Sequence, residues 1–97
     1  MKYFFEWDTE KANSNFKKHK VKFEVATTIF RDPNALTIFD DEHSEHEDRW
    51  ITIGITQNSH LILVVHTFNI YNKNDIIIRI ISARKASKNE MKFYKGG

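Results

Sequence analysis

Hydrophobic positions near the start of the chain follow a helical pattern after one short strand. Residues 3–7 are rich in aromatic side chains and are expected to form a short edge strand. Asp8 then precedes a helix predicted over residues 9–19, because an aspartate caps the free N–H groups of a first turn well. One face of this helix carries Ala12, Phe16 and His19. A second helix is predicted over residues 23–30, and it ends before Pro33 because the residue preceding a proline avoids helical backbone angles.

The rest of the chain changes to the shorter pattern of strands and ends in a helix. Four strands are expected over residues 36–40, 48–56, 61–69 and 76–82. Polar residues at 57–60 form a hairpin turn, and those at 71–75 form the loop before the last strand. A final helix is predicted over residues 83–94, with Ser82 capping its first turn.

Alternation within the strands indicates which faces are buried. In strand 48–56 the odd positions hold Arg49, Ile51, Ile53 and Ile55, and the even positions hold Trp50, Thr52, Gly54 and Thr56. One face is expected to be core, and the mixed face is expected to be available to a partner. The two later strands are apolar on both faces, as central strands are. The sequence thus predicts an α+β domain, with a small antiparallel sheet of about four strands, two N-terminal helices and one C-terminal helix.

Composition limits the class of protein. A chain of 97 residues fits a single domain over residues 1–97. Its lack of cysteine excludes disulfides and cysteine-ligated zinc, and suits the cytosol. No secretory segment opens the chain, and the longest run without charge, residues 50–72, contains amides and histidines. A soluble cytoplasmic protein without membrane contact is therefore expected.

Charge is distributed unevenly along the chain. Residues 1–31 carry a net charge of +3, residues 32–48 carry −7 and residues 49–97 carry +6. A basic C-terminal half beside an acidic segment is typical of a protein that meets polyanions on one side. The alternative is that these are ordinary solvated surfaces. The modest total of +2 argues against non-specific coating of DNA.

Short motifs along the chain occur in a characteristic order. They begin with Phe5-Glu6-Trp7-Asp8, Lys18-His19 and Phe30-Arg31-Asp32-Pro33, and continue with Glu47-Asp48-Arg49 and His66-Thr67. The strongest segment runs from Arg79 to Ala86 and is followed by Glu90 and Tyr94. Together they cover about residues 5–94, and in this order and spacing the chain resembles the BrnT family. Three residues depart from the pattern: Lys20 stands where many relatives have Gly, Lys22 where a Ser or Asp would cap the second helix, and Asn69 where some relatives carry Arg.

The resemblance implies a RelE-like fold and a toxin of a type II toxin–antitoxin system, a ribonuclease that inhibits translation. It also implies neutralisation by a BrnA-type antitoxin with a ribbon-helix-helix domain, in a heterotetramer that represses its own operon. DNA would then be contacted only through the antitoxin. A different class of function also fits the sequence: a non-catalytic binding subunit that assembles with a DNA-binding partner as a transcriptional autorepressor.

Cleavage of RNA without metal or cofactor needs a base, an acid and cations around the phosphate. Histidine suits the first two roles because its pKa lies near 6.5, and arginine suits the third because its planar fork meets phosphate bidentately. The candidates for catalysis are Arg79, Arg84, His66, His19 and Arg49. The candidates for RNA contact are Lys18, Lys85 and Tyr94.

Each candidate also has a structural interpretation. Arg79 lies between isoleucines and either binds phosphate or pairs with Glu47 or Asp48. Arg84, expected at a helix start, either holds an anion there or is solvated. His66 is a catalyst or a satisfied buried residue, His19 a catalyst or a helix-end cap, and Arg49 a phosphate ligand or the partner of nearby acids. Tyr94 stacks on a base, donates a proton or packs, and the two lysines are phosphate contacts or solvated.

The acidic segment 40–48 also contains His43 and His46. Such a dense set of ligands can hold a divalent metal, but more often it is only solvated. No metal site is therefore assigned. The segment is alternatively a surface that faces a basic part of the antitoxin or steers RNA away.

Overall fold

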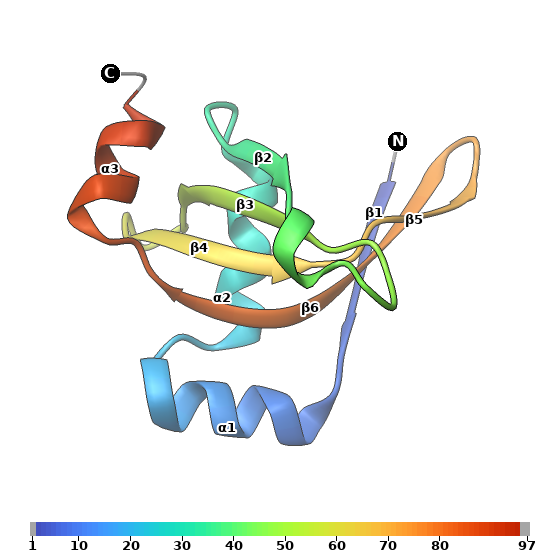
Figure 1. The fold of residues 1–97 in the computed structure, drawn as a ribbon, viewed down its shortest axis with the longest axis horizontal. Helices are drawn as coiled ribbons and strands as arrows, with labels where there is room; N and C mark the ends of the chain where they lie inside the picture. The colour runs from blue at the N-terminus through green and yellow to red at the C-terminus, as the bar shows by residue number, and fades with distance from the viewer. Residues whose placement is uncertain (1, 96–97) are drawn as a thin grey trace.

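The computed structural model describes residues 2–95 and folds them around one curved sheet (Figure 1). Its strands are β1 (Lys2–Trp7), β2 (Leu36–Phe39), β3 (Trp50–Ile55), β4 (Leu61–His66), β5 (Asn69–Asn72) and β6 (Asp75–Lys85). Its α-helices are α1 (Thr9–His19), α2 (Phe23–Ala26) and α3 (Lys88–Tyr94), and its 3₁₀ turns are η1 (Thr27–Arg31) and η2 (Asp41–His43). None of the helices in this part of the chain has the length and apolar character needed to cross a membrane.

The sheet is mixed and has six strands, so the prediction of about four antiparallel strands was wrong in both respects. The strand order is β1-β6-β4-β3-β2, and β5 pairs with the beginning of β6. β1 runs parallel to β6, whereas the other pairs are antiparallel. Parallel strands need a long connection, and residues 8–74 supply it between β1 and β6. The α+β class is confirmed.

The N-terminal helices form where local sequence signals place them. The Asp8 carboxylate accepts the backbone N–H of Lys11 at 3.1 Å, which caps α1. The helix ends at His19, followed by Lys20 in the left-handed region with φ 61°. The second predicted helix is present as α2 continued by η1, and it ends immediately before Asp32.

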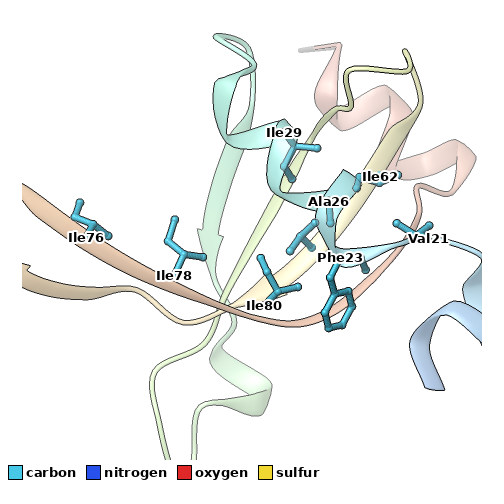
Figure 2. Packing of buried hydrophobic residues seen from close by; sticks show 10 residues of the cluster. Val21, Phe23, Ala26, Ile29, Ile62, Ile76, Ile78 and Ile80 are labelled. Carbon is cyan, nitrogen blue, oxygen red and sulfur yellow. The ribbon is translucent and has the colours of Figure 1, made fainter. Parts of the chain in front are cut away.

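The core lies between the sheet and the helical layer of α2 and η1 (Figure 2). Buried side chains of Phe23, Ala26 and Ile29 face those of β4 and β6. The strands contribute Ile62, Val64, Ile76, Ile78, Ile80 and Ala83. The helical layer thus covers one face of the sheet. We call the opposite face, which includes Arg79 and Ile51, the open face.

The face of β3 that packs against the helical layer is the mixed one, although Ile53 on the isoleucine face is also buried, with 4% exposure. The mixed face is the one that packs against η1, because Gly54 lets the helix approach: a Cβ at Gly54 would lie 3.0 Å from Cβ of Ile29. Thr52 on the same face is 1% exposed and its hydroxyl is hydrogen-bonded. The isoleucines at 51 and 53 consequently lie on the open face.

The last strand is longer than predicted and the last helix starts later. β6 continues to Lys85, and Ser87, not Ser82, caps α3 through a reciprocal capping box with Glu90. Arg84 therefore lies in a strand and not at a helix start. A β-bulge opposite Val65 and His66 leaves both Ile80 and Ala83 in the core. Their neighbours Arg79 and Arg84, five positions apart, consequently share the open face.

Candidate functional site

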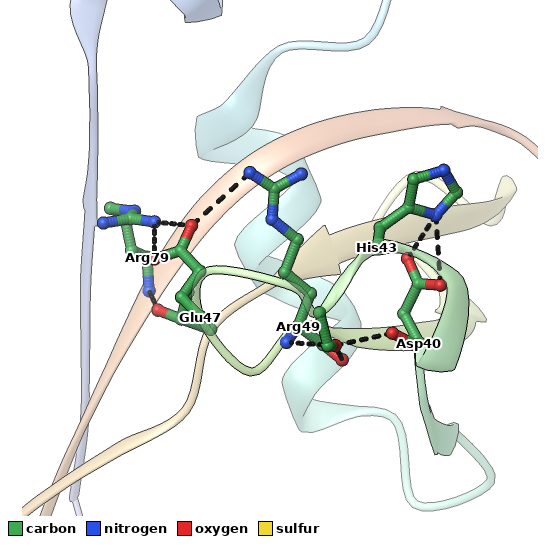
Figure 3. Close-up of polar contacts among 7 residues, drawn as sticks. Asp40, His43, Glu47, Arg49 and Arg79 are labelled. Atoms are coloured by element: carbon green, nitrogen blue, oxygen red, sulfur yellow. Dashed lines mark hydrogen bonds and ion pairs between the residues drawn. The ribbon is translucent and has the colours of Figure 1, made fainter.

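Two arginines converge on one carboxylate on the open face of the sheet (Figure 3). Nη2 of Arg79 lies 2.5 and 2.6 Å from the two oxygens of Glu47. Nη2 of Arg49 approaches the same carboxylate at 3.4 Å. Arg79 comes from β6, whereas Glu47 and Arg49 both come from the loop that precedes β3, so two segments distant in sequence build this cluster.

The loop that carries Glu47 is closed at its base by hydrogen bonds. The N–H of Asp40 donates to the carbonyl of Arg49 at 2.8 Å. The Ser44 hydroxyl accepts the N–H of Arg49 at 3.0 Å and donates to the carbonyl of Asp40 at 2.5 Å. These bonds hold the two ends of the loop together, so the Glu47 side chain can extend to Arg79 on β6 (Figure 3).

Backbone contacts fix Arg79 while its side chain stays accessible. Its N–H donates to the Thr67 hydroxyl at 3.3 Å, and its carbonyl accepts the Thr67 N–H at 3.0 Å. The Arg79 side chain is 40% exposed and that of Glu47 is 34% exposed. The hydrogen bond from Arg79, assisted by the charges of both arginines, holds the pKa of Glu47 below its ordinary value. Glu47 is thus an ionised carboxylate that water and ligands can reach.

Arg49 retains donors that Glu47 does not use. Its Nε is buried and has no hydrogen-bond partner among the described residues. The Arg49 side chain as a whole is 31% exposed, so its terminal N–H donors remain open to a ligand. A forked anion placed between Arg79 and Arg49 would satisfy both guanidinium groups, so the cluster has the chemistry of a phosphate site.

Arg84 forms a second ion pair farther along the open face. Its two terminal nitrogens donate to the two oxygens of Glu90, each at 2.8 Å. The hydrogen bond from Arg84 lowers the pKa of Glu90 to about 2. Five positions of strand separate Arg84 from Arg79, or about 15 Å. In this arrangement the two arginines therefore hold different carboxylates.

His66 lies on the opposite face, in the core. It is fully buried, between the rings of Phe30 and Phe68. Nδ1 faces the carbonyl of Thr67 at 3.0 Å, so this nitrogen carries the proton and Nε2 accepts from the Thr52 hydroxyl at 2.7 Å. All polar atoms of the ring are thereby satisfied. The structure gives His66 the surroundings of a buried packing residue and keeps it away from the arginine cluster.

This environment predicts a pH dependence of stability. Burial lowers the pKa of His66 from 6.5, so the unfolded chain takes up this proton at a higher pH than the folded protein. The free energy of unfolding should therefore fall as the pH drops below about 6.5 and be retained above it. Denaturant unfolding of the wild type at about pH 7.5 and pH 5.5 measures the difference. His66→Gln should be less stable throughout but lose the pH dependence, whereas His60→Gln, at an exposed position, should keep it. An equal slope in His66→Gln would contradict the assignment.

Lys18 and His19 lie beside β6 beyond the end of β1. Together with Ser82 they line a shallow hollow between α1 and the free edge of the strand. The side chain of Asn15 covers this edge: it donates to the carbonyl of Ala83 at 2.8 Å and accepts its N–H at 3.1 Å. Lys85 is exposed at the end of β6. These basic side chains flank the last strand, but none is part of the arginine cluster.

Tyr94 connects α3 to the helical layer. Its hydroxyl donates to Asp32 at 2.6 Å, and this bond raises the pKa of Tyr94 to about 12. The same Asp32 carboxylate accepts the N–H groups of Asn34 and Ile55 at 2.9 Å each. Since the hydroxyl is engaged and holds its proton firmly, Tyr94 anchors the last helix.

The two histidines of the acidic segment differ in their contacts. His43 Nδ1 lies 3.1 Å from both oxygens of Asp40 (Figure 3). His46 is exposed and lines a small hollow with Glu47 and Arg49. Within residues 2–95 no group of three His, Asp or Glu side chains is arranged to hold a metal.

Glu47 is a site residue that the sequence pattern predicts only as an ion-pair partner of Arg79. Its signal is weak, because it is one of seven acids between residues 32 and 48. Glu47 differs from the other acids because the loop conformation brings its side chain to Arg79. Its spacing from Arg49, two positions along one segment, is the only part of the cluster that is local in sequence.

Comparison with known proteins identifies the family. Residues 7–90 match the family described as the ribonuclease toxin BrnT of type II toxin–antitoxin systems. The fold is similar to the crystal structure of the Brucella abortus ribonuclease toxin BrnT, with a TM-score of 0.60 and 21% identity over 91% of this chain and 100% of that one. No curated protein sequence matches significantly. The family match covers most of the chain, and the shared fold agrees with it. The chain therefore belongs to the BrnT family of ribonuclease toxins of type II toxin–antitoxin systems.

Proposed function

We propose that this protein is a metal-independent endoribonuclease whose reacting phosphate binds between Arg79 and Arg49. The observation that carries the proposal is the convergence of both guanidinium groups on the accessible Glu47 carboxylate. A carboxylate and a phosphate share the forked acceptor geometry that arginine binds. Glu47 therefore occupies, in the free protein, the place that an RNA phosphate takes during the reaction.

When the phosphate displaces Glu47 from the two arginines, the Glu47 carboxylate becomes the general base. Once the arginines turn to the phosphate, the carboxylate loses its cationic partners and gains an anionic neighbour, and both changes raise its pKa. It then accepts the proton of the ribose 2′-OH, the 2′-oxygen bonds to phosphorus and the bond from phosphorus to the 5′-oxygen breaks. His46, which lines the same hollow, supplies a proton to the leaving 5′-oxygen. Arg79 and Arg49 stabilise the additional charge on the phosphorane.

Other basic side chains hold the RNA on either side of the reacting phosphate. Arg84 continues the open face in one direction, and Lys85 extends from the end of the same strand. Lys18 and His19 stand at the edge of β6 near Ser82. We assign them to backbone phosphate contacts, which position RNA without reading its sequence. Such an enzyme acts on cytoplasmic RNA and inhibits translation by destroying it.

The antitoxin partner that a type II system implies is expected to cover this open face. We propose a BrnA-type protein that binds DNA through its own ribbon-helix-helix domain and occludes the arginine cluster in a heterotetramer. A toxin without catalytic activity would instead act only as a subunit of that repressor. Growth arrest on induction of the toxin alone supports the enzyme, and normal growth with verified folded protein supports the subunit.

A cleavage assay tests the proposed reaction. Purified protein, freed of its antitoxin, should cleave RNA equally well in EDTA and in buffer with added Mg²⁺, because arginines supply the charge that a metal would otherwise provide. The products should carry a 2′,3′-cyclic phosphate and a 5′-hydroxyl. Loss of cleavage in EDTA and its recovery with Mg²⁺ or Mn²⁺ would overturn the proposal. It would point to the loop of His43 and His46 as a metal site.

A further inference from the structure

We propose that the groove between the open face and α3 binds one nucleobase of the RNA, next to the phosphate held by Arg79 and Arg49. This inference rests on the proposed ribonuclease function and goes beyond it by adding a base-binding subsite. The reasons are the lining of the groove, its place relative to the arginine cluster and the charges at its two ends.

The groove has an apolar floor and one aromatic wall. Its volume is about 340 Å³. The floor is formed by Leu36, Ile38, Ile51, Ile53 and Leu63, from three neighbouring strands. Phe93 of α3 forms the wall and is 55% exposed, so a planar ligand can stack on its ring. Aromatic and aliphatic surfaces of this kind hold nucleobases, because every base has an apolar face.

Polar groups stand where the edge of a base would lie. Asn89, Arg84 and Glu90 line the rim beside α3. The ion pair between Arg84 and Glu90 is bidentate and keeps both side chains in place. The rim therefore offers amide, guanidinium and carboxylate groups within one fixed arrangement. Such a combination of apolar floor and polar rim is typical of sites for small planar ligands.

The groove lies next to the proposed phosphate site. Ile51 in its floor follows Arg49, the residue that precedes β3, by two positions, or about 7 Å of extended chain. A base in the groove would consequently belong to a nucleotide beside the reacting phosphate. Arg49 lies just beyond the Ile51 end of the groove and Arg84 lines its rim beside Leu63, so positive charge is present on both sides of that nucleotide. This distribution of charge fits a single RNA strand.

Cleavage of a short RNA by Phe93→Ala tests the subsite. Its kcat/KM should fall about tenfold, as expected for the loss of one stacked base. The control is Met91→Ala, on the same helix and 42% exposed but outside the groove, and it should cleave like the wild type. An RNA with an abasic ribose on one side of the cleaved bond should reduce wild-type kcat/KM by a similar factor. Phe93→Ala should then show no further loss on this abasic RNA. A 2′-deoxy analogue, which cannot be cleaved, should show the same pattern in its affinity.

The outcomes separate the subsite from the proposed function. If the wild type cleaves RNA, and neither the Phe93→Ala substitution nor the abasic substrate lowers kcat/KM, the base subsite is refuted. The proposed ribonuclease function then remains. If Phe93→Ala weakens only the binding of the antitoxin, the groove is an antitoxin site and the inference is wrong. If the wild type neither cleaves RNA nor binds the analogue, the proposed function itself fails.

Discussion

Replacement of Arg79 by alanine is expected to lower RNA cleavage by roughly a hundredfold or more and to abolish growth arrest. The loss of one charge-assisted contact to the transition state costs about 3 kcal/mol. The fold should persist, because the Arg79 side chain is 40% exposed and its pair with Glu47 is open to solvent. Such exposed pairs contribute about 1 kcal/mol or less to stability. A cleavage assay together with thermal melting measures both effects.

Two further variants make the result specific to the guanidinium. Arg79→Lys should recover little activity, because a point charge cannot reproduce the bidentate fork. Arg31→Ala removes an exposed arginine from η1, away from the cluster, and should cleave RNA normally. A folded Arg79→Ala protein with full toxicity would rule out the catalytic role. Unfolding of this variant would show that the ion pair is mainly structural.

Glu47→Gln is expected to reduce cleavage by about a hundredfold or more, which is the usual contribution of a general base. The substitution keeps the size of the side chain and removes only its ability to accept the proton. RNA binding should be unchanged or tighter, because the negative charge that competes with phosphate for Arg79 and Arg49 is gone. Single-turnover cleavage and the affinity for a 2′-deoxy analogue measure these two effects separately.

Glu45→Gln is the matched control, since Glu45 is an exposed carboxylate that lines the same hollow without contacting either arginine. It should cleave RNA like the wild type. If Glu47→Gln cleaves as fast as the wild type or faster, Glu47 only competes with the substrate and the base must be another group. Equal losses in both variants would indicate an effect of the overall charge of the loop.

Local signals in the sequence predicted local structure well. Asp8 marked the start of α1, and Pro33 marked the end of the second helical segment, because caps and prolines act within a few residues. The boundary of α3 was equally local but was misplaced. The S-x-x-E pattern from Ser87 to Glu90 is a capping box and marks the true start of the helix.

Features that depend on contacts between distant residues could not be predicted from the local hydrophobic pattern. The mixed face of β3 is buried because Gly54 meets η1 and Thr52 meets His66, contacts between separate elements. The bulge in β6 decides that Arg84 shares a face with Arg79, and alternation alone would have separated them. The parallel pairing of β1 with β6 produces no recognisable signal in the sequence of either strand.

The candidate site was predictable in part. Arg79 could be singled out because a cation in an otherwise apolar strand requires a partner or a function. Glu47 could not be chosen from its acidic neighbours, since it lies 32 positions before Arg79 and is brought there by the loop closed by Asp40 and Ser44. His66 carried the right chemistry, but burial on the far face separates it from the cluster.

The most direct test of one shared catalytic site is the double variant Arg79→Ala with Glu47→Gln. Residues that act in a single step are not additive, so the loss of cleavage in the double variant should be close to that of the more severe single variant. Single-turnover cleavage of one defined RNA by the four proteins, with melting temperatures to verify folding, provides the comparison. Losses that multiply to about ten-thousandfold would indicate independent contributions, and near-normal cleavage by the double variant would contradict the site altogether.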